Sequence, residues 1–470
     1  RNSAGAPGGA GRPLKVNRDL LLYEARRLRQ QGDRTPANRG RRGEAYGESE
    51  RLFRRVIGMD PTDGRAYVGL GKLLLAQRRA EEAREVYRLG CDNTGGENAY
   101  VWQSWGVLEA RAGNAREARK LFDAASVADP AHSGTWHSWG HLEEREGNVA
   151  RARDLYLRGL KAAPPDRPPQ YLLQSLALLA ARNGRVPEAR AWFERSLDLN
   201  DDQPSMWESW GSMEARLGNQ EAARQYFQNA LSGSNSRYAW LSWGRWETRW
   251  GNFQRGRDLL QISHRRYPAD TPIVQALAIA EAELGNVGRA RGLFRKATQM
   301  DQQHQQSWQA WAMLEWRQGN TEEARDLFQQ GVWADPTSRN VVCVFKAWGD
   351  LEVSEANAEM GRAMYQCAIR ADPSSRRSWY ALADLEESQG NVQLAEELRA
   401  AAAEADASLE TSVNLGPSAL EERLWTNVLD SEVKPLFRTF LSRWKQTWVE
   451  ANVPGQPDPQ YIPITIHNNT

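Results

Sequence analysis

The chain has 470 residues, and its 61 Lys and Arg nearly balance its 60 Asp and Glu, which leaves a net charge of +1. This balance excludes a uniformly basic nucleic-acid binder, so any site for a polyanion must come from local sorting of charge. No apolar run approaches the ~20 residues of a membrane-spanning helix. The three cysteines, Cys91, Cys343 and Cys367, form neither an even disulfide set nor a metal-binding pair, which favours a reducing compartment.

Residues 1–17 are predicted to be a disordered leader. The stretch RNSAGAPGGAGRP is rich in small residues, and no acidic residue precedes Asp19. An acid-poor segment of this kind also fits the end of an organellar transit peptide. Both interpretations stay open. The first helical hairpin follows at residue 18, with DLLLYEARRLRQQGD as its first helix, TPANRGRRG as an interruption and ESERLFRRVIGMDP as its second helix.

The chain then repeats one unit of about 34 residues. The stretch WQSWGVLEARAGNAREARKLFDAASVADP, residues 102–130, recurs as WESWGSMEARLGNQEAARQYF, WLSWGRWETRWGNFQRGRDLL and WQAWAMLEWRQGNTEEARDLF. An arginine that follows a small residue marks each copy at Arg84, Arg119, Arg153, Arg190, Arg224, Arg257, Arg291, Arg325 and Arg362. A period this steady indicates a stacked repeat array, which we expect to hold eleven units over residues 18–403.

Each unit predicts two antiparallel helices. Trp102, Trp105 and Leu108 share one helical face, Gly113 ends that helix, and Pro130 ends the next. The aromatic side chains are too large to bury within one pair, so neighbouring pairs must stack. The predicted fold is all-α: a right-handed α-solenoid, or superhelix, of about eleven hairpins. The residues predicted to hold it together are Trp102, Trp105, Glu109, Arg119, Trp136, Trp139, Trp207, Trp210, Trp240, Trp243, Trp308 and Trp311.

A Glu and an Arg stand ten residues apart in most units, as Glu109 and Arg119 do. Ten residues across a tight turn can bring two side chains together, so an ion pair between the two helices of one hairpin is the simple prediction. Phosphate binding by these arginines is the alternative. Arg190 is singled out, because Ala180 stands where its partner is expected.

Beyond residue 403 the repeat pattern ends. The stretch LWTNVLDSEVKPLFRTFLSRWKQTW predicts helices, so residues 404–450 are predicted to form a helical cap over the exposed hydrophobic end of the stack. Docking of a partner protein is the alternative for this segment. Residues 451–470 are predicted to be an irregular tail.

Nothing in the pattern predicts catalysis. An enzyme needs differently specialised groups that converge, whereas Glu, Arg and Trp recur identically along this chain. His137 and His141 have the i, i+4 spacing of a zinc site, yet no cysteine lies nearby and no glutamate follows His137. We expect no enzyme activity, no metal, no cofactor and no small-molecule substrate.

The hairpin length and the Gly and Ala positions resemble a tetratricopeptide repeat. The paired tryptophans, the Glu, the Gly-Asn pair and the Ala-Arg pair resemble its half-a-tetratricopeptide (HAT) variant, found mainly in RNA-processing proteins. The regular W-x-x-W-G-x-L-E-x-R-x-G-N pattern is similar to chloroplast HAT factors that protect and mature psbB and psbH messages. The unit 171–200 departs from the pattern at Leu176, Ala177 and Ala180, the unit 274–301 lacks both tryptophans, and Glu396 replaces the last Arg. Those units are expected to stack more loosely.

In tetratricopeptide geometry the first helix lines the concave groove, and the residue two before the turn glycine faces inward. These positions hold Arg111, Arg145, Arg182, Arg216, Arg249 and Arg317, a set we call the arginine ladder. Polar residues stand eight positions earlier at Gln103, His137, Gln174, Gln275 and Gln309. Arginine suits phosphate or base stacking, and amides can bond base edges. A solvated surface with no binding role is the alternative for both sets.

The resemblance implies a sequence-specific single-stranded RNA-binding protein. Such a protein would stabilise and mature a psbB/psbH messenger in the chloroplast stroma by holding its 5′ untranslated region, blocking exonucleases and remodelling the RNA. It implies single-stranded RNA and other RNA-processing proteins as partners, and no membrane. The alternative is a protein–protein scaffold of an RNA-processing complex, and the nucleus is the alternative compartment.

Overall fold

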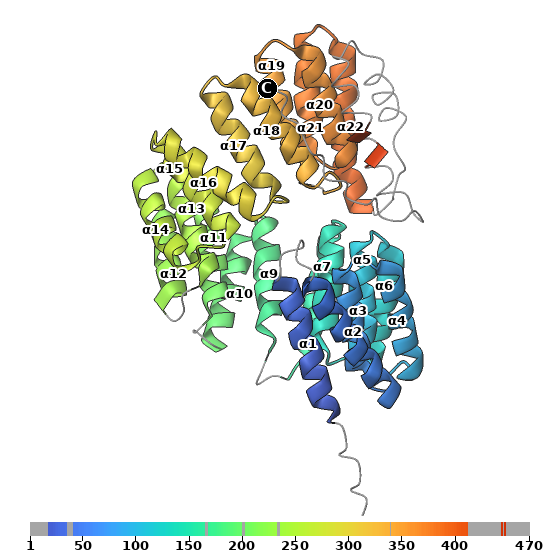
Figure 1. Ribbon diagram of the computed structural model, residues 1–470. Helices are drawn as coiled ribbons and strands as arrows, with labels where there is room; N and C mark the ends of the chain where they lie inside the picture. The colour runs from blue at the N-terminus through green and yellow to red at the C-terminus, as the bar shows by residue number, and fades with distance from the viewer. Residues whose placement is uncertain are drawn as a thin grey trace, which may run out of the picture. The chain divides into compact units, whose positions relative to one another are not determined.

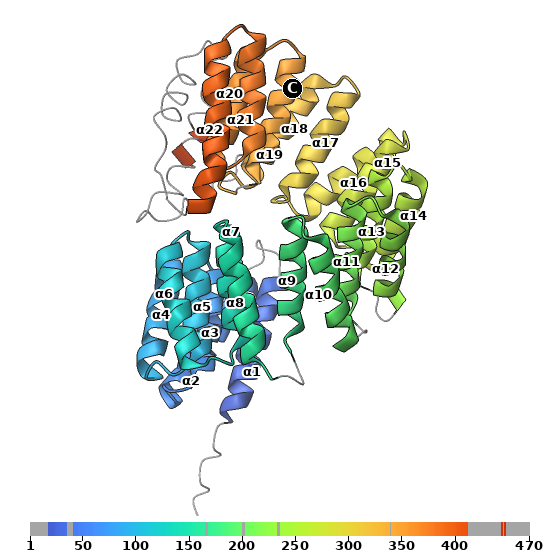
Figure 2. The same ribbon diagram turned by 180° about the vertical axis from the view of Figure 1, so that it is seen from behind.

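The computed structural model describes residues 17–34, 41–164, 168–199, 203–232, 236–338, 340–411, 443–444 and 446–447. Within these ranges the chain forms twenty-two α-helices and no strand. Consecutive helices pair into antiparallel hairpins, which Figures 1 and 2 show side by side from two directions. The predicted all-α repeat fold is confirmed. Its right-handed sense stays a prediction.

The chain divides into two compact units, residues 1–192 and 193–470. The helices of the first unit are α1 (Arg18–Arg34), α2 (Arg41–Met59), α3 (Gly64–Ala76), α4 (Ala80–Asn93), α5 (Ala99–Arg111), α6 (Ala115–Ala128), α7 (Ser133–Arg145), α8 (Val149–Ala162) and α9 (Gln170–Arg182). Helix α10 (Val186–Leu199) spans the division. The helices of the second unit are α11 (Pro204–Arg216), α12 (Gln220–Ser232), α13 (Arg237–Arg249), α14 (Phe253–Arg266), α15 (Thr271–Glu283), α16 (Val287–Met300), α17 (Gln305–Arg317), α18 (Thr321–Ala334), α19 (Val341–Ser354), α20 (Ala358–Ala371), α21 (Arg376–Ser388) and α22 (Val392–Thr411).

A glycine close to the middle of a first helix lets the two helices of a hairpin approach. A Cβ at Gly106 would lie 2.7 Å from a ring carbon of Phe122, so the second helix lays its aromatic ring directly on the backbone of the first. Phe122 also stacks on Trp139 of the following hairpin, with ring centroids 6.5 Å apart. Phe122 and Trp139 are both buried. Neighbouring hairpins therefore cover each other's aromatic side chains, as their size predicts.

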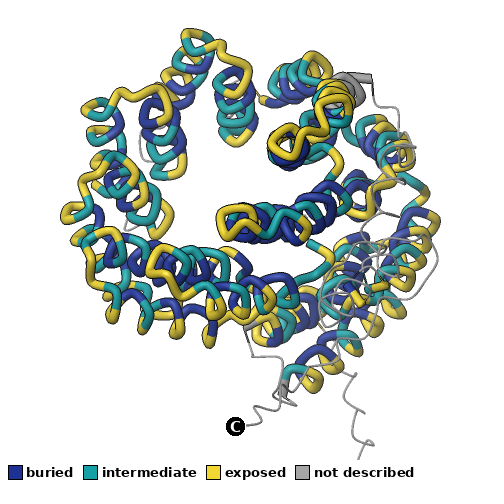
Figure 3. The backbone as a smooth tube through the Cα atoms, turned by 90° about the horizontal axis from the view of Figure 1, so that it is seen from above, coloured by how far each residue is buried: buried dark blue, intermediate teal, exposed yellow. Residues whose placement is uncertain are grey.

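Burial follows the sides at which helices meet. Figure 3 shows buried residues along the helix sides that face neighbouring helices and exposed residues at many of the turns. In each unit a first helix packs on the next first helix, as α5 does on α7 and α13 on α15, while successive second helices make no comparable contact among the described residues. The first helices therefore form the inner side of each unit. We call this side the inner face.

The structure describes only a small part of the segments predicted at the two ends of the chain. The leader 1–17, except Asn17, and the tail 451–470 lie outside the described residues. Of the predicted cap, Trp444 is fully buried against Phe345 of α19, with ring centroids 4.8 Å apart, and its indole Nε1 donates to the Pro336 carbonyl at 3.2 Å. This contact lies on the hairpin before the last, and helix α22 continues to Thr411, beyond the predicted repeat boundary at 403.

None of the described helices is both long and apolar enough to cross a membrane.

Candidate nucleic-acid interface

A buried carboxylate joins each regular pair of neighbouring hairpins. Glu143, fully buried in α7, accepts hydrogen bonds from Arg119 of the preceding hairpin, with Nε–Oε1 at 2.8 Å and Nη2–Oε2 at 3.0 Å. The indole of Trp139 donates to Oε1 at 3.1 Å, and the amide of Asn148 donates to Oε2 at 2.8 Å. Both carboxylate oxygens are thus satisfied by groups from two hairpins. The same connection recurs as Arg84–Glu109, Arg224–Glu247, Arg291–Glu315, Arg325–Glu352 and Arg362–Glu386.

The prediction of an ion pair within one hairpin, such as Glu109 with Arg119, was therefore wrong. Ala118 is fully buried beneath its own first helix, and the next residue of a helix lies about 100° further round. The guanidinium of Arg119 consequently points toward the following hairpin, where Glu143 stands. The pair joins two hairpins, and the Nε and Nη2 donors of Arg119 are already bonded to a carboxylate.

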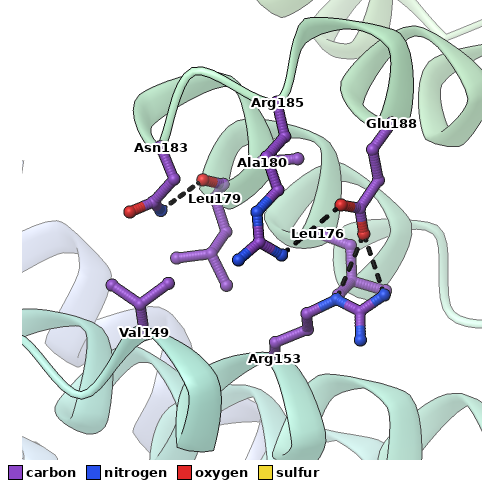
Figure 4. A pocket seen from close by; sticks show the side chains of 8 residues that line it. All are labelled: Val149, Arg153, Leu176, Leu179, Ala180, Asn183, Arg185 and Glu188. Carbon is purple, nitrogen blue, oxygen red and sulfur yellow. Dashed lines mark hydrogen bonds and ion pairs between the residues drawn. The ribbon is translucent and has the colours of Figure 1, made fainter.

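The interpretation of Arg190 needs the same correction. Because each arginine uses the next hairpin's glutamate, Ala180 removes the partner of Arg153, not that of Arg190, which has its own interaction in the structure. Figure 4 shows how the chain compensates: Arg153 reaches Glu188 of α10, with Nη2–Oε1 at 3.0 Å, beside a small pocket lined by Leu176, Leu179 and Ala180. This pocket is an irregular hairpin junction.

The two predicted tryptophans of a unit have different roles. The second one donates its indole N–H to the buried glutamate four residues later, as Trp105, Trp139, Trp210, Trp243 and Trp311 do. The first one donates to a carbonyl in the preceding loop: Trp102 to Gly96 at 2.8 Å, Trp136 to Pro130 at 2.8 Å and Trp308 to Gln302 at 3.0 Å. Trp207 stacks on Trp210, and Arg266 lies over Trp240. These side chains hold the first helices in place.

All six arginines of the ladder are exposed at the ends of first helices. Three reach the preceding first helix: Arg145 donates to the Ala110 carbonyl, Arg182 pairs with Glu144, and Arg317 pairs with Glu283. Arg249 lies over the ring of Trp246, 5.2 Å from its centroid. Four members, Arg111, Arg145, Arg216 and Arg249, therefore have no carboxylate partner among the described residues.

The predicted polar readers mostly join neighbouring first helices. Gln103 donates to Ser138 at 2.8 Å, and Gln309 donates to the Cys343 carbonyl at 3.1 Å. Gln275 is buried, accepts from Arg245 and donates to the Gln306 carbonyl, so its amide is directed to neighbouring first helices. His137 lies against Tyr171, with ring centroids 5.1 Å apart, and its burial lowers its pKa. Gln174 also has an interaction partner.

Two sets of inner-face residues were missed. The first set is the residue directly after the helix glycine, which lies one turn before the ladder position. This residue is basic or a histidine in three first helices, and its side chain is exposed in each: Lys72, His141 and Arg245. The second residue of the first helix is an exposed tyrosine at Tyr100, Tyr171 and Tyr238. Both sets could have been found in the sequence, because the basic residues directly follow the helix glycine and the tyrosines stand at a fixed distance before the turn glycine. They add charge and aromatic surface to the side that carries the ladder.

The charge of this stripe changes sign near the end of the second unit. Asp350 follows the helix glycine in α19, Asp384 takes the same position in α21, and the ladder positions there are Ser354 and Ser388. The cationic stripe therefore ends with α17. Among the described residues, no group of three or more His, Cys, Asp or Glu side chains is placed to hold a metal ion.

Exposed arginines at a regular pitch, with aromatic rings beside them, define a helical-repeat surface suited to an extended anionic chain. Two family models match the sequence. Residues 107–273 match the C-terminal HAT repeat of the pre-mRNA-splicing factors Syf1 and CRNKL1, and residues 39–98, 275–339 and 346–410 match the tetratricopeptide repeat. The matched parts of the chain are therefore HAT and tetratricopeptide repeats.

Curated relatives make the resemblance more specific, and they confirm it. The chain is 46% identical over 235 residues to the chloroplastic PsbB mRNA maturation factor Mbb1 of Chlamydomonas reinhardtii, a match that covers 49% of this chain and 35% of that protein. It is 48% identical over 121 residues to protein high chlorophyll fluorescent 107 of Arabidopsis thaliana, covering 26% of this chain and 17% of that protein. The matches thus span about a third and about a sixth of the two relatives.

Among solved structures, the yeast Tom70 crystal structure is similar with a TM-score of 0.49 at 12% identity, over 93% of this chain and 98% of that one.

Proposed function

We propose that the chain binds single-stranded RNA along the inner face of its first helices. The observation that carries this proposal is the set of four ladder arginines, Arg111, Arg145, Arg216 and Arg249, which are exposed and have no carboxylate partner among the described residues. A guanidinium without a carboxylate keeps its charge and its N–H donors for phosphate oxygens. Ladder arginines stand on five successive first helices, α5 to α13, before Glu283 of α15 interrupts the series, and this recurrence suits contacts at intervals along an extended strand.

Exposed aromatic rings supply the second element of such a site. Tyr100, Tyr171 and Tyr238 begin first helices that end in Arg111, Arg182 and Arg249. An unstacked base can lie on a tyrosine ring whatever its sequence, and single strands expose such bases. A double helix would hide the same bases. The combination therefore favours a single strand.

The name of one relative supports a proposal about which RNA this chain binds. That relative is named as a chloroplastic maturation factor of the psbB message. We propose that this chain likewise acts in the chloroplast, in the stroma, on the 5′ untranslated region of a psbB/psbH message. A strand held along the inner face would be closed to exonucleases and unable to base-pair, which is how binding alone stabilises and remodels a message.

The test is direct binding by the purified chain. A labelled single-stranded segment of the psbB 5′ untranslated region should be retained and protected from a 5′→3′ exonuclease, while the same segment annealed to its complement should not be retained. A shuffled RNA of equal composition is the control for sequence specificity. RNA-free protein that forms a stable dimer in light scattering and protects no RNA would favour the protein scaffold instead.

A further inference from the structure

Three neighbouring first helices at the start of the first unit carry four cationic side chains, and the charges of three of them act on the fourth, Lys72. Helix α1 packs on α3, and α3 packs on α5. These helices carry Arg26 and Arg29, Lys72, and Arg111. Arg26, Lys72 and Arg111 are exposed and have no carboxylate partner among the described residues, and the carboxylate of Asp33 lies 3.9 Å from Arg29. We call these four residues the cation cluster.

A buried tyrosine of α4 packs against α3 next to the position of Lys72 in the sequence. Tyr87 of α4 is 1% exposed, and a Cβ at Gly71 would lie 2.6 Å from its hydroxyl oxygen, so the ring packs on α3 at Gly71, the residue before Lys72. Burial raises the pKa of Tyr87, and the nearby positive charges of Arg111 and Arg29 oppose that rise. The phenol oxygen therefore lies within electrostatic reach of the cluster.

In two other hairpins the tyrosine that corresponds to Tyr87 donates its hydroxyl to a carboxylate. Tyr156 and Tyr365 lie under Gly140 and Gly349, each sixteen residues after its glycine, as Tyr87 lies after Gly71. The hydroxyl of Tyr156 donates to Glu144 at 3.1 Å, and that of Tyr365 donates to Asp350 at 2.8 Å. The Tyr87 hydroxyl makes no hydrogen bond with any of the described residues. The hairpin of α3 and α4 thus lacks the anionic oxygen that its two counterparts contain.

The cluster carries an energetic cost without an anion. Loss of hydration and then the charges of Arg29, Arg26 and Arg111 lower the pKa of Lys72. Like charges held this close on three packed helices repel one another, and a bound anion would relieve that repulsion. Elsewhere the ladder offers at most one arginine per hairpin, and at Arg182 and Arg317 a carboxylate already pairs with it.

We propose that the cation cluster binds the terminal phosphate monoester of the RNA strand. This inference rests on the proposed function and deepens it, because it assigns one end of the strand to the α1–α3–α5 end of the chain. A monoester carries about −1.5 to −2 at pH 7, whereas a phosphodiester carries one negative charge. Its oxygens accept from the guanidiniums, from Lys72 Nζ and from the Tyr87 hydroxyl.

The test uses the full chain and one RNA made with three ends: hydroxyls only, a 5′ phosphate, or a 3′ phosphate. Fluorescence anisotropy should show one phosphorylated form binding about tenfold tighter than the hydroxyl form, which is the effect expected of one charged hydrogen bond. The identity of that form reports the strand polarity. The advantage should shrink as the pH falls below about 6, where the monoester takes up a proton.

The double variant Arg26→Gln/Lys72→Gln should abolish the preference for the phosphorylated end, measured as the ratio of the affinities for the phosphorylated and hydroxyl forms, so that a general loss of cationic surface cancels. Arg88→Gln, an exposed cation on the second helix α4, is the matched control and should keep the preference. Circular dichroism checks folding. Should the double variant not fold, competition by inorganic phosphate on the unmodified chain decides: phosphate should erase the preference at concentrations that leave hydroxyl-ended RNA bound.

Equal affinity of the unmodified chain for all three forms would overturn the terminal-phosphate site and leave the proposed RNA binding intact. Binding of none of the three would overturn the proposed function, and the terminal site with it.

Discussion

Arg119 of one hairpin holds the fully buried Glu143 of the next through two hydrogen bonds, Nε–Oε1 at 2.8 Å and Nη2–Oε2 at 3.0 Å. This connection, repeated along the chain, sets how one first helix lies beside the next. The spacing of the arginine ladder therefore depends on Arg119, Glu143 and their counterparts, which are not members of the ladder.

The Arg119→Gln variant should be destabilised by about 3 kcal/mol, because it leaves the Glu143 carboxylate buried without its cation. The Glu143→Gln variant should lose less, about 1–2 kcal/mol, because the amide oxygen still accepts from Trp139. The midpoint of urea unfolding measures both. Lys120→Gln, which removes an exposed ion pair with Glu117, is the control and should change stability by less than about 1 kcal/mol. Equal effects of all three variants would contradict a structural role for the pair.

The junction of α14 and α15 should behave differently. Glu281 is fully buried, but Leu277 stands where other hairpins have the tryptophan donor, Arg257 bonds Asp258, and Oε1 of Glu281 has no hydrogen bond. Among the residues that the structure describes, this carboxylate accepts from Asn286 and forms an ion pair with the exposed Arg289, whose Nη1 lies 3.1 Å from Oε1. Glu281→Gln should therefore be nearly neutral, while Glu315→Gln should cost about 2 kcal/mol. Urea unfolding of the two variants compares them, and equal losses would show that the missing donors do not matter.

Low pH should lower the stability of the fold by protonating the buried glutamates that join neighbouring hairpins. Burial alone would raise the pKa of Glu143, but hydrogen bonds from Arg119 and Asn148 hold it below its usual value, and Glu109, Glu247 and Glu315 behave alike. A lowered pKa in the folded state stabilises the fold fully above the unfolded value of about 4.3, and this contribution is lost as the pH falls through the folded value.

The pH experiment compares the unmodified chain with Glu143→Gln. The difference in their unfolding midpoints should be constant from about pH 7 to 5 and should shrink below about pH 4. A difference that grows toward acid would mean that the carboxylate is not paired in the folded state.

Helix glycines offer a matched pair of substitutions. Gly106→Ala should cost about 1–3 kcal/mol, because the added Cβ would press on the Phe122 ring at 2.7 Å. Gly292→Ala, in α16, meets no atom within 4 Å and should stabilise the chain by about 0.5–1 kcal/mol. Thermal unfolding distinguishes the two signs. A stabilising Gly106→Ala would contradict the close approach of α5 and α6.

The repeat period predicts the fold well, because the sequence of each hairpin contains the signals that begin its helices, make the turn between them and end the second helix. Gly113 takes a left-handed φ of +84° at the predicted turn, and the same conformation recurs at Gly147, Gly218 and Gly319. Sequence spacing cannot predict which neighbour Arg119 contacts. Residues ten apart in one hairpin and residues in adjacent hairpins are both within reach, and only the rotation of the second helix decides.

The candidate site could be predicted in part for a related reason. The arginine ladder occupies the last turn of its first helices and is exposed, because its position relative to the turn glycine repeats, and its inward direction stays a prediction. Whether an arginine is paired depends on the preceding first helix, as at Arg182 with Glu144 and Arg317 with Glu283, and one repeat does not reveal that. Gln275 illustrates the same limit, because burial against α17 removes its amide from the surface.

The central claim is that the unpaired ladder arginines hold RNA phosphates. The most direct measurement is the salt dependence of RNA affinity for three proteins: the unmodified chain, Arg216→Ala/Arg249→Ala, and Arg182→Ala/Arg317→Ala. Each lost phosphate contact should flatten the slope of log K against log salt by about 0.7, so the first double variant should lose about 1.4. The second should lose clearly less, because Glu144 and Glu283 already pair with those arginines. Identical slopes for all three proteins would contradict the account.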